Sequence, residues 1–241
     1  MVAGNKPDVK EAREVAESRK RTLLDWWCGK PWLYATYVLG AVMLVVLVLN
    51  RSSWSVPQKL IGILCVLLPL HVFEELEWPN GFQFMMNKVI QKSDNPLAYP
   101  ENRLTDMITN FGAEVMFIAM LVFTPVAGNM FVVFMAFFGI GETIAHTAFT
   151  VATLRHYKAA GMRSPYTPGI VTAYCTLLPV GIASLHWLIT SGTFVPSDLR
   201  GILFVMFLIG FMIRLPFIVS YKIKSTRFAY DSMGYFARFE R

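Results

Sequence analysis

Six long apolar stretches, separated by short segments with charged residues, glycine and proline, dominate the pattern of this chain. A helix needs about 20 consecutive apolar residues to cross the hydrocarbon layer of a membrane, and each stretch has about that length. The pattern therefore predicts an all-α fold, a polytopic bundle of six transmembrane helices. The helices are expected at about Trp32 to Leu49, Pro57 to Glu77, Leu104 to Thr124, Met130 to Leu154, Thr167 to Ile189 and Gly201 to Tyr221.

The segments outside these helices divide the chain into three regions. Residues 1–30 form a charged segment, expected in the cytoplasm or at the membrane surface, and residues 31–221 form the six-helix transmembrane domain. Residues 222–241 form a basic, aromatic tail, a composition typical of the membrane interface. Phe82 to Lys92 is short and amphipathic, which predicts a helix lying in that interface.

The composition agrees with a membrane protein and excludes other classes. Of 241 residues, 55% are hydrophobic and 16% are charged, and the mean hydropathy is +0.47. The net charge of +6 does not indicate a nucleic-acid partner, because the basic residues flank the apolar stretches. Cys28, Cys65 and Cys175 form no CxxC pair, so neither a disulfide framework nor a thiolate zinc site is indicated.

The distribution of lysine and arginine predicts the orientation in the membrane. With the N-terminus inside, 18 of these residues lie on the cytoplasmic side and 3 on the opposite side. Positively charged loops stay in the cytoplasm. We therefore expect both termini inside, in an integral, multi-pass protein of the inner or plasma membrane if the source is bacterial.

A histidine and two carboxylates stand near the end of the second apolar stretch, in His71-Val72-Phe73-Glu74-Glu75. Charged groups in a membrane helix cost about 2.5–3.5 kcal/mol each on insertion scales, so they usually face a protected interior and a partner. Glu74 follows His71 by three residues and Glu75 follows it by four. Both carboxylates can therefore share a helix face with the imidazole.

Other apolar stretches carry matching polar groups. Asn110 and Glu114 are four residues apart in the third stretch, as are Glu142 and His146 in the fourth. Together with Arg214 and the motif, these groups lie roughly 9–18 Å from the cytoplasmic helix ends, at 1.5 Å per residue. This agreement in depth predicts one shared site in the cytoplasmic half of the bundle.

Imidazole and carboxylate side chains suit a divalent transition metal such as zinc or iron. Two histidines with four glutamates equal the ligand count of a di-iron carboxylate bundle, but the spacing departs from the Glu-x-x-His pairs of such sites. A mononuclear zinc site with two histidines and one glutamate fits as well. The expected metal ligands are His71, Glu75, Glu114, Glu142 and His146. The expected catalytic residues are Glu74, Glu75, Asn110, Glu114 and Arg214.

Arg214 needs an anionic partner, because an unpaired guanidinium inside a membrane is costly. We expect Arg214 to face the bundle and to pair with a carboxylate of the second or fourth helix, in the first place Glu74, since Glu75 is the motif glutamate that aligns with His71. Asp106 is expected at the membrane interface.

The motif and two later elements resemble the HXXEE family of multi-pass membrane proteins. The later elements stand here as Asn110-Phe111-Gly112-Ala113-Glu114 and Gly141-Glu142-Thr143-Ile144-Ala145-His146. A further stretch, Tyr166-Thr167-Pro168-Gly169 followed by Thr172 and Ala173, is also similar. The resemblance covers roughly residues 57–190. It implies a multi-pass membrane fold and no particular activity, because the family is essentially uncharacterised.

These observations predict an integral membrane enzyme with a cytoplasm-facing, metal-dependent His/Glu site that acts on a lipid-like or amphiphilic substrate. One alternative is a metal-free acid–base isomerase, since His71 and Glu75 followed by Asp106 and Glu114 are faintly similar to the sterol-isomerase group. Another is a proton-coupled transporter, although the apolar outer halves of the second to fourth helices offer no continuous polar path. The last is a buried polar network that only holds the helices together.

Overall fold

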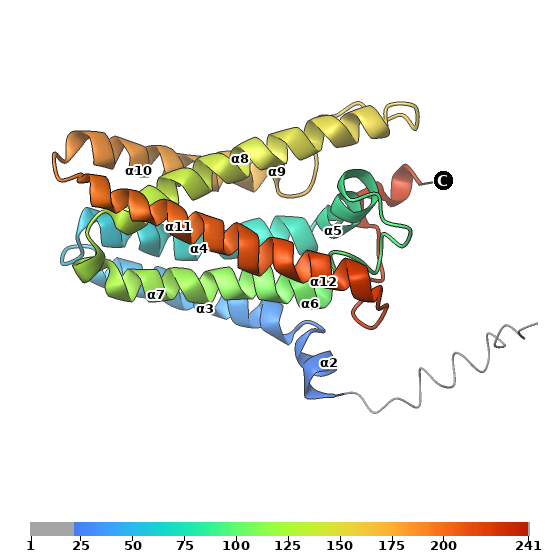
Figure 1. Cartoon of the computed structure of the whole chain (residues 1–241), viewed down its shortest axis with the longest axis horizontal. Helices are drawn as coiled ribbons and strands as arrows, with labels where there is room; N and C mark the ends of the chain where they lie inside the picture. The colour runs from blue at the N-terminus through green and yellow to red at the C-terminus, as the bar shows by residue number, and fades with distance from the viewer. Residues whose placement is uncertain (1–21, 241) are drawn as a thin grey trace, which may run out of the picture.

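The computed structural model of the protein describes residues 22–240 (Figure 1). Residues 1–21 of the predicted N-terminal segment lie outside this range. Every regular element in residues 22–240 is a helix, and six helices are long and apolar enough to cross a membrane. The all-α fold with six candidate spans is thereby confirmed, and the orientation with both termini inside stays a prediction.

The spans begin and end within a few residues of the predicted boundaries. In chain order they are α3 (Pro31–Asn50); α4 (Val56–Leu76); α6 (Arg103–Asp106), η2 (Met107–Phe111) and α7 (Gly112–Ala127); α8 (Met130–His156); α9 (Ile170–Thr172), η3 (Ala173–Leu177) and α10 (Leu178–Thr190); and η4 (Pro196–Arg200), α11 (Gly201–Phe207), η5 (Leu208–Arg214) and α12 (Leu215–Ile223). The other helical segments are α2 (Leu23–Trp27), α5 (Phe82–Met85), η1 (Met86–Ile90) and η6 (Gly234–Arg238).

Three spans contain a π-helical segment, namely η2, η3 and η5. η3 and η5 each end two residues before a proline, Pro179 and Pro216. Proline lacks an N–H group and crowds the preceding turn, so a wider turn at that point absorbs the distortion. η2 precedes no proline. It carries Thr109 and Asn110, and isolated π-helical turns often occur at functional sites.

Glycines bring the backbones of α8 and α10 into contact. A Cβ atom at Gly139 would lie 2.3 Å from the carbonyl oxygen of Leu177, and one at Gly181 would lie 2.9 Å from the backbone nitrogen of Ile140. Small residues at a crossing let membrane helices approach this closely. α8 and α10 therefore form one tightly packed side of the bundle.

The sixth span meets α8 closely near its beginning. A Cβ atom at Gly201 would lie 2.0 Å from the carbonyl oxygen of Met130 and 2.9 Å from the backbone nitrogen of Phe134. Beyond this point the two helices diverge, and α12 lies beside α6 (Figure 1). Of the most apolar window of the sixth span, 11% is buried, compared with 56% for α8. The sixth span is thus the least packed of the six.

The short helix predicted after the second span is formed by α5 and η1. Its buried Phe84 packs in a cluster with the C-terminal tail, where the fully buried Phe236 stacks on Tyr157 with 5.5 Å between ring centroids. The short helix and the tail therefore cover one end of the bundle. Their position at the membrane surface stays a prediction.

Candidate functional site

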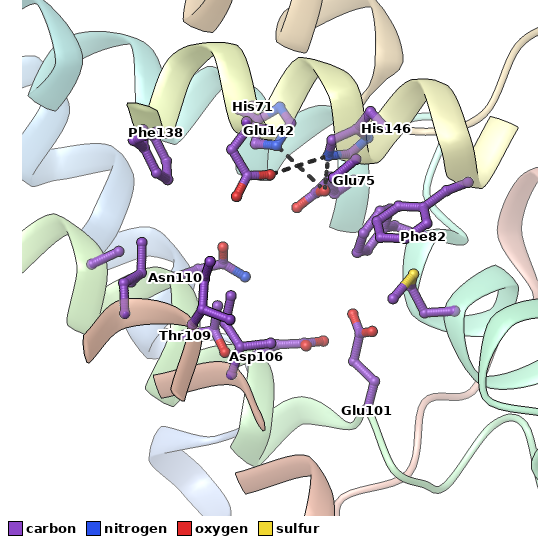
Figure 2. Close-up of a pocket in the computed structure, with 18 of the residues that line it drawn as sticks. His71, Glu75, Phe82, Glu101, Asp106, Thr109, Asn110, Phe138, Glu142 and His146 are labelled. Atoms are coloured by element: carbon purple, nitrogen blue, oxygen red, sulfur yellow. Dashed lines mark ion pairs between the residues drawn. The ribbon is translucent and has the colours of Figure 1, made fainter. Parts of the chain in front are cut away.

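The last turns of α4 place the motif residues in the interior. His71, Glu74 and Glu75 are all buried, and α8 adds His146, which is 1% exposed, and Glu142 one turn before it. Nε2 of His71 lies 3.4 Å from Oε1 of Glu75, and Nε2 of His146 lies 3.3 Å from the same oxygen. Oε2 of Glu142 lies 3.8 Å from Nε2 of His146 (Figure 2). The structure thus brings together four of the five predicted metal ligands.

The two glutamates of the motif have different neighbours. Glu74 accepts hydrogen bonds from the hydroxyl of Tyr166 at 3.1 Å and from the backbone N–H of Val171 at 3.3 Å. It also accepts from the backbone N–H of Thr172 at 2.8 Å and from the hydroxyl of Thr172 at 2.5 Å. Glu74 therefore anchors the beginning of the fifth span, whereas Glu75 faces the two histidines.

Thr172 connects Glu74 to His71. The single proton of the Thr172 hydroxyl is donated to Glu74, so the hydroxyl oxygen accepts from Nδ1–H of His71, 2.8 Å away. With its proton on Nδ1, the neutral imidazole presents the lone pair of Nε2 to Glu75. A hydrogen bond that fixes the ring in this way is typical of metal-binding histidines.

His146 is enclosed by rings and backbone. Its ring centroid lies 4.9 Å from that of His71 and 5.2 Å from that of Phe82. Gly169 has a φ angle of +90°, and a Cβ atom there would lie 2.4 Å from Cε1 of His146 and 3.0 Å from Oε1 of Glu75. Glycine is therefore required at position 169, where the backbone closes one side of the cluster. Nδ1 of His146 has no hydrogen-bond partner among residues 22–240.

The cluster forms one wall of a cavity of about 410 Å³. The opposite wall comes from η2 and the segment before it, where Asp106, Thr109, Asn110 and Glu101 face the cluster across the space (Figure 2). Most of the remaining lining is apolar and comes from η1, α8 and the sixth span. The cavity therefore has two polar walls that face each other, and its remaining sides are apolar.

Glu101 is a cavity residue that sequence reasoning missed. It is 3% exposed, and the side-chain amide of Asn87 binds its backbone N–H and its carbonyl, both at 2.8 Å. Its Oε2 atom has no hydrogen-bond partner in the part of the chain that the structure describes. Burial raises the pKa of the Glu101 carboxyl well above its ordinary value, and the neighbouring Asp106 raises it further. The residue lies in a loop, so helical periodicity gave no signal for it.

Asp106 lies inside the protein, and its expected depth at the membrane interface stays a prediction. It is 2% exposed, lines the cavity and accepts a hydrogen bond from the hydroxyl of Tyr230 in the C-terminal tail. The tail covers this end of the third span, which the sequence of the span itself does not reveal. Asn110 lines the same wall, in agreement with its predicted depth in the third span.

Glu114 lies apart from the other predicted ligands. It is fully buried beside Cys65 of α4, does not line the cavity and has no hydrogen-bond partner for either carboxylate oxygen among the described residues. Asn110 faces the cavity, whereas Glu114 lies against α4, so the spacing of four residues does not bring both side chains to the site.

The predicted pairing of Arg214 with Glu74 is wrong. Arg214 lines the cavity but is exposed, and it makes no ion pair with any of residues 22–240. Both carboxylate oxygens of Glu74 instead accept hydrogen bonds from Tyr166, Val171 and Thr172.

Comparison with known proteins gives one match. A family model described as a protein of unknown function with HXXEE motif matches residues 62–184. This range contains the motif in α4, the whole of α8 and the segment that binds Glu74. No curated protein and no solved structure matches the chain.

Proposed function

This chain belongs to the HXXEE family, and because the function of that family is unknown, we propose from the site itself that the protein is a membrane-embedded metalloenzyme. In this proposal His71, Glu75 and His146 hold one divalent transition metal, zinc or iron, and the cavity receives a lipid-like or amphiphilic substrate from the cytoplasmic half of the bundle.

The observation that carries the proposal is the contact of two histidine nitrogens with one carboxylate oxygen. The lone pair of Nε2 of His71 faces Glu75 Oε1 at 3.4 Å, and such a contact is favourable only if a proton or a metal cation lies between the two atoms. The distances of 3.4 Å and 3.3 Å from Glu75 to the histidines are longer than ordinary hydrogen bonds, which favours the cation. Ligand atoms of a tetrahedral zinc, each about 2.0–2.1 Å from the metal, lie about 3.3 Å from one another.

The donor set agrees with the same assignment. One ligand atom from each of His71, Glu75 and His146 lies within 4.8 Å of the others, and all three residues are buried. Two imidazoles and one carboxylate suit zinc and non-haem iron and leave a coordination position for water or substrate. A metal bound there would supply Lewis acidity. Glu142, at 3.8 Å from His146, would orient a polar group beside it.

The acids on the opposite wall support a second candidate. Glu101 and Asp106 are neighbouring buried carboxyl groups that face the same cavity, an arrangement suited to moving a proton without a metal. A metal-free acid–base isomerase therefore remains the alternative to the metalloenzyme.

Metal analysis of the purified protein tests the choice between them. We expect about one zinc or iron per chain, lost in both His71→Ala and His146→Ala. His186→Ala is the matched control, because His186 is an exposed histidine of the fifth span and should leave the metal content unchanged. Glu114→Gln should also retain the metal. A folded wild-type protein that takes up no zinc or iron would reject the metal site and favour the isomerase.

A further inference from the structure

The cavity beside the cluster opens on the membrane-facing side of the bundle. Among its lining residues, Phe137 and Gly141 of α8 and Ile209 and Arg214 of the sixth span are exposed. These two helices are the ones that meet at Gly201 and then diverge. The mouth of the cavity therefore lies between α8 and η5.

The mouth lies near the middle of both spans. Gly141 stands about 16 Å from the start of α8 and about 22 Å from its end, at 1.5 Å per residue. Ile209 stands about 20 Å from either end of the sixth span. The flanking apolar residues Ile144 and Met206 are 65% and 63% exposed. In a membrane this mouth opens to hydrocarbon rather than to water or lipid headgroups.

We infer that the cavity takes a single-chain amphiphile with an uncharged, oxygen-bearing head, an alcohol or a carbonyl compound, which enters sideways from the bilayer between α8 and η5. The inference rests on the proposed function only in that the bound molecule would be the substrate of the enzyme. Its entry into the protein depends only on the cavity and its mouth. A head that passes through this mouth crosses hydrocarbon, where a charged group is much more costly than an uncharged one.

The groups inside the cavity disfavour an ionised head. Four carboxyl groups line it, those of Glu75, Glu101, Asp106 and Glu142, and the one guanidinium among its lining residues, that of Arg214, lies at the exposed mouth. Inside the cavity, a carboxylate or phosphate head would therefore meet carboxyl groups and no lysine or arginine. A cationic head would compete with the divalent metal of the proposed site. A head with an uncharged oxygen avoids both the carboxyl groups and the competition with the metal. It finds hydrogen-bond partners in Asn110 and in Oε2 of Glu101, an atom without a hydrogen-bond partner among the described residues.

The size of the cavity fits the head and the first carbons of such a molecule. A volume of about 410 Å³ is near the lower end of the range of about 300–1,000 Å³ for small-molecule sites. The rest of a long chain would stay in the bilayer, against the apolar edges of the mouth.

Photolabelling of the full-length protein in liposomes tests the inference. The probe is a long-chain alcohol that carries a diazirine and a terminal alkyne, compared with the same chain ending in a carboxylate or a quaternary ammonium. We expect the alcohol to label peptides that contain residues 137–149 and 205–217, and to label them more strongly than either charged probe. Stronger labelling of these peptides by a charged probe would overturn the uncharged head.

Two variants block the mouth without entering the metal site. No atom lies within 4 Å of a Cβ at Gly141, so Gly141→Phe places a ring in the mouth without a clash and should reduce labelling severalfold. Gly210→Phe is the matched control, since Gly210 is equally open but does not line the cavity. Ile209→Trp narrows the opposite edge, with exposed Phe211→Trp as its control.

The same samples separate this inference from the proposed function. Metal content and unfolding temperature should be equal in all four variants, which shows that they fold. Cavity labelling that persists in both Gly141→Phe and Ile209→Trp would overturn entry through this mouth. If the protein holds no metal and the two mouth variants still block the labelling, lipid entry would be supported and only the metal site would be rejected.

Discussion

The side-chain amide of Asn87 and the backbone of Glu101 are joined by two hydrogen bonds of 2.8 Å, one in each direction. The same amide donates to the carbonyl of Pro96, and Asn87 is 0% exposed. Asn87 thus supplies the hydrogen-bond partners of the buried backbone N–H and carbonyl of Glu101. This residue of η1 holds the loop that aims Glu101 into the cavity.

Asn87→Ala should therefore destabilise the protein by about 2–4 kcal/mol, because it leaves the buried backbone N–H and carbonyl of Glu101 without a partner. The measurement is unfolding of the purified protein in detergent. Asn50→Ala is the control, since partly buried Asn50 makes a single bond to the carbonyl of Val46. Equal losses in the two variants would contradict the anchoring role of Asn87.

Thr172 should control metal affinity without touching the metal. Thr172→Val keeps the shape of the side chain but removes the hydroxyl that holds Nδ1 of His71. We expect metal affinity to fall about 10–100-fold, as for other changes behind a ligand. Competition with a chelator measures this affinity.

Thr172→Ser restores a hydroxyl and should recover most of the affinity. Thr190→Val is the matched control, because the exposed hydroxyl of Thr190 donates only to the carbonyl of His186. If the serine and valine variants at position 172 bound the metal equally well, the hydrogen bond between Thr172 and His71 would have no role in metal binding.

Glu101 should make stability depend on pH. Burial, and then Asp106, raise its pKa well above the ordinary 4.5. The folded state thus holds this proton more tightly than the unfolded chain. The contribution of Glu101 to the free energy of unfolding is therefore complete below about pH 4.5 and is lost as the pH rises towards the pKa of the folded state. Glutamine resembles the protonated form and does not titrate.

Glu101→Gln should therefore gain stability relative to the wild type between about pH 5 and about pH 8. Unfolding of both proteins across this range measures the difference. Glu77→Gln serves as control, because Glu77 is partly exposed and paired with Lys30. A wild-type-to-variant difference that does not change with pH would contradict a buried, protonated Glu101.

The predicted orientation can be checked with single cysteines in a background without Cys28, Cys65 and Cys175. Ser53 and Thr193 lie in loops at one end of the bundle, and Ala160 lies beyond α8 at the other (Figure 1). An impermeant thiol reagent added to intact cells should label Ser53→Cys and Thr193→Cys but not Ala160→Cys. The opposite pattern would reverse the orientation, and labelling at both ends would contradict the span count.

Periodicity accounts for what could be predicted of the site. His71 and Glu75 are one helical turn apart in α4, as are Glu142 and His146 in α8, and both helices are regular there. The same spacing does not bring Glu114 to the cavity with Asn110, because Glu114 lies against Cys65 of α4 instead.

Contacts distant in sequence account for the rest. The donors to Glu74 come from Tyr166, Val171 and Thr172, more than 90 residues away, and two of the four are backbone N–H groups, which any residue but proline carries. The sequence predicted the wrong partner for Arg214 because these distant donors, which no local pattern reveals, already bind Glu74. Glu101 likewise depends on Asn87, a contact within a loop that no helical pattern describes.

The loose packing of the sixth span makes the lipid environment part of the architecture. The span has 28 residues, about 42 Å at 1.5 Å per residue, which exceeds a hydrocarbon thickness of about 30 Å. The polar first turn, Pro196–Arg200, and Lys222 can lie outside the hydrocarbon, and because protein covers little of the apolar part, the surrounding lipid contributes to the tilt of the helix. Acyl-chain length is therefore expected to alter the width of the mouth between α8 and η5, and with it the access of a substrate to the cavity.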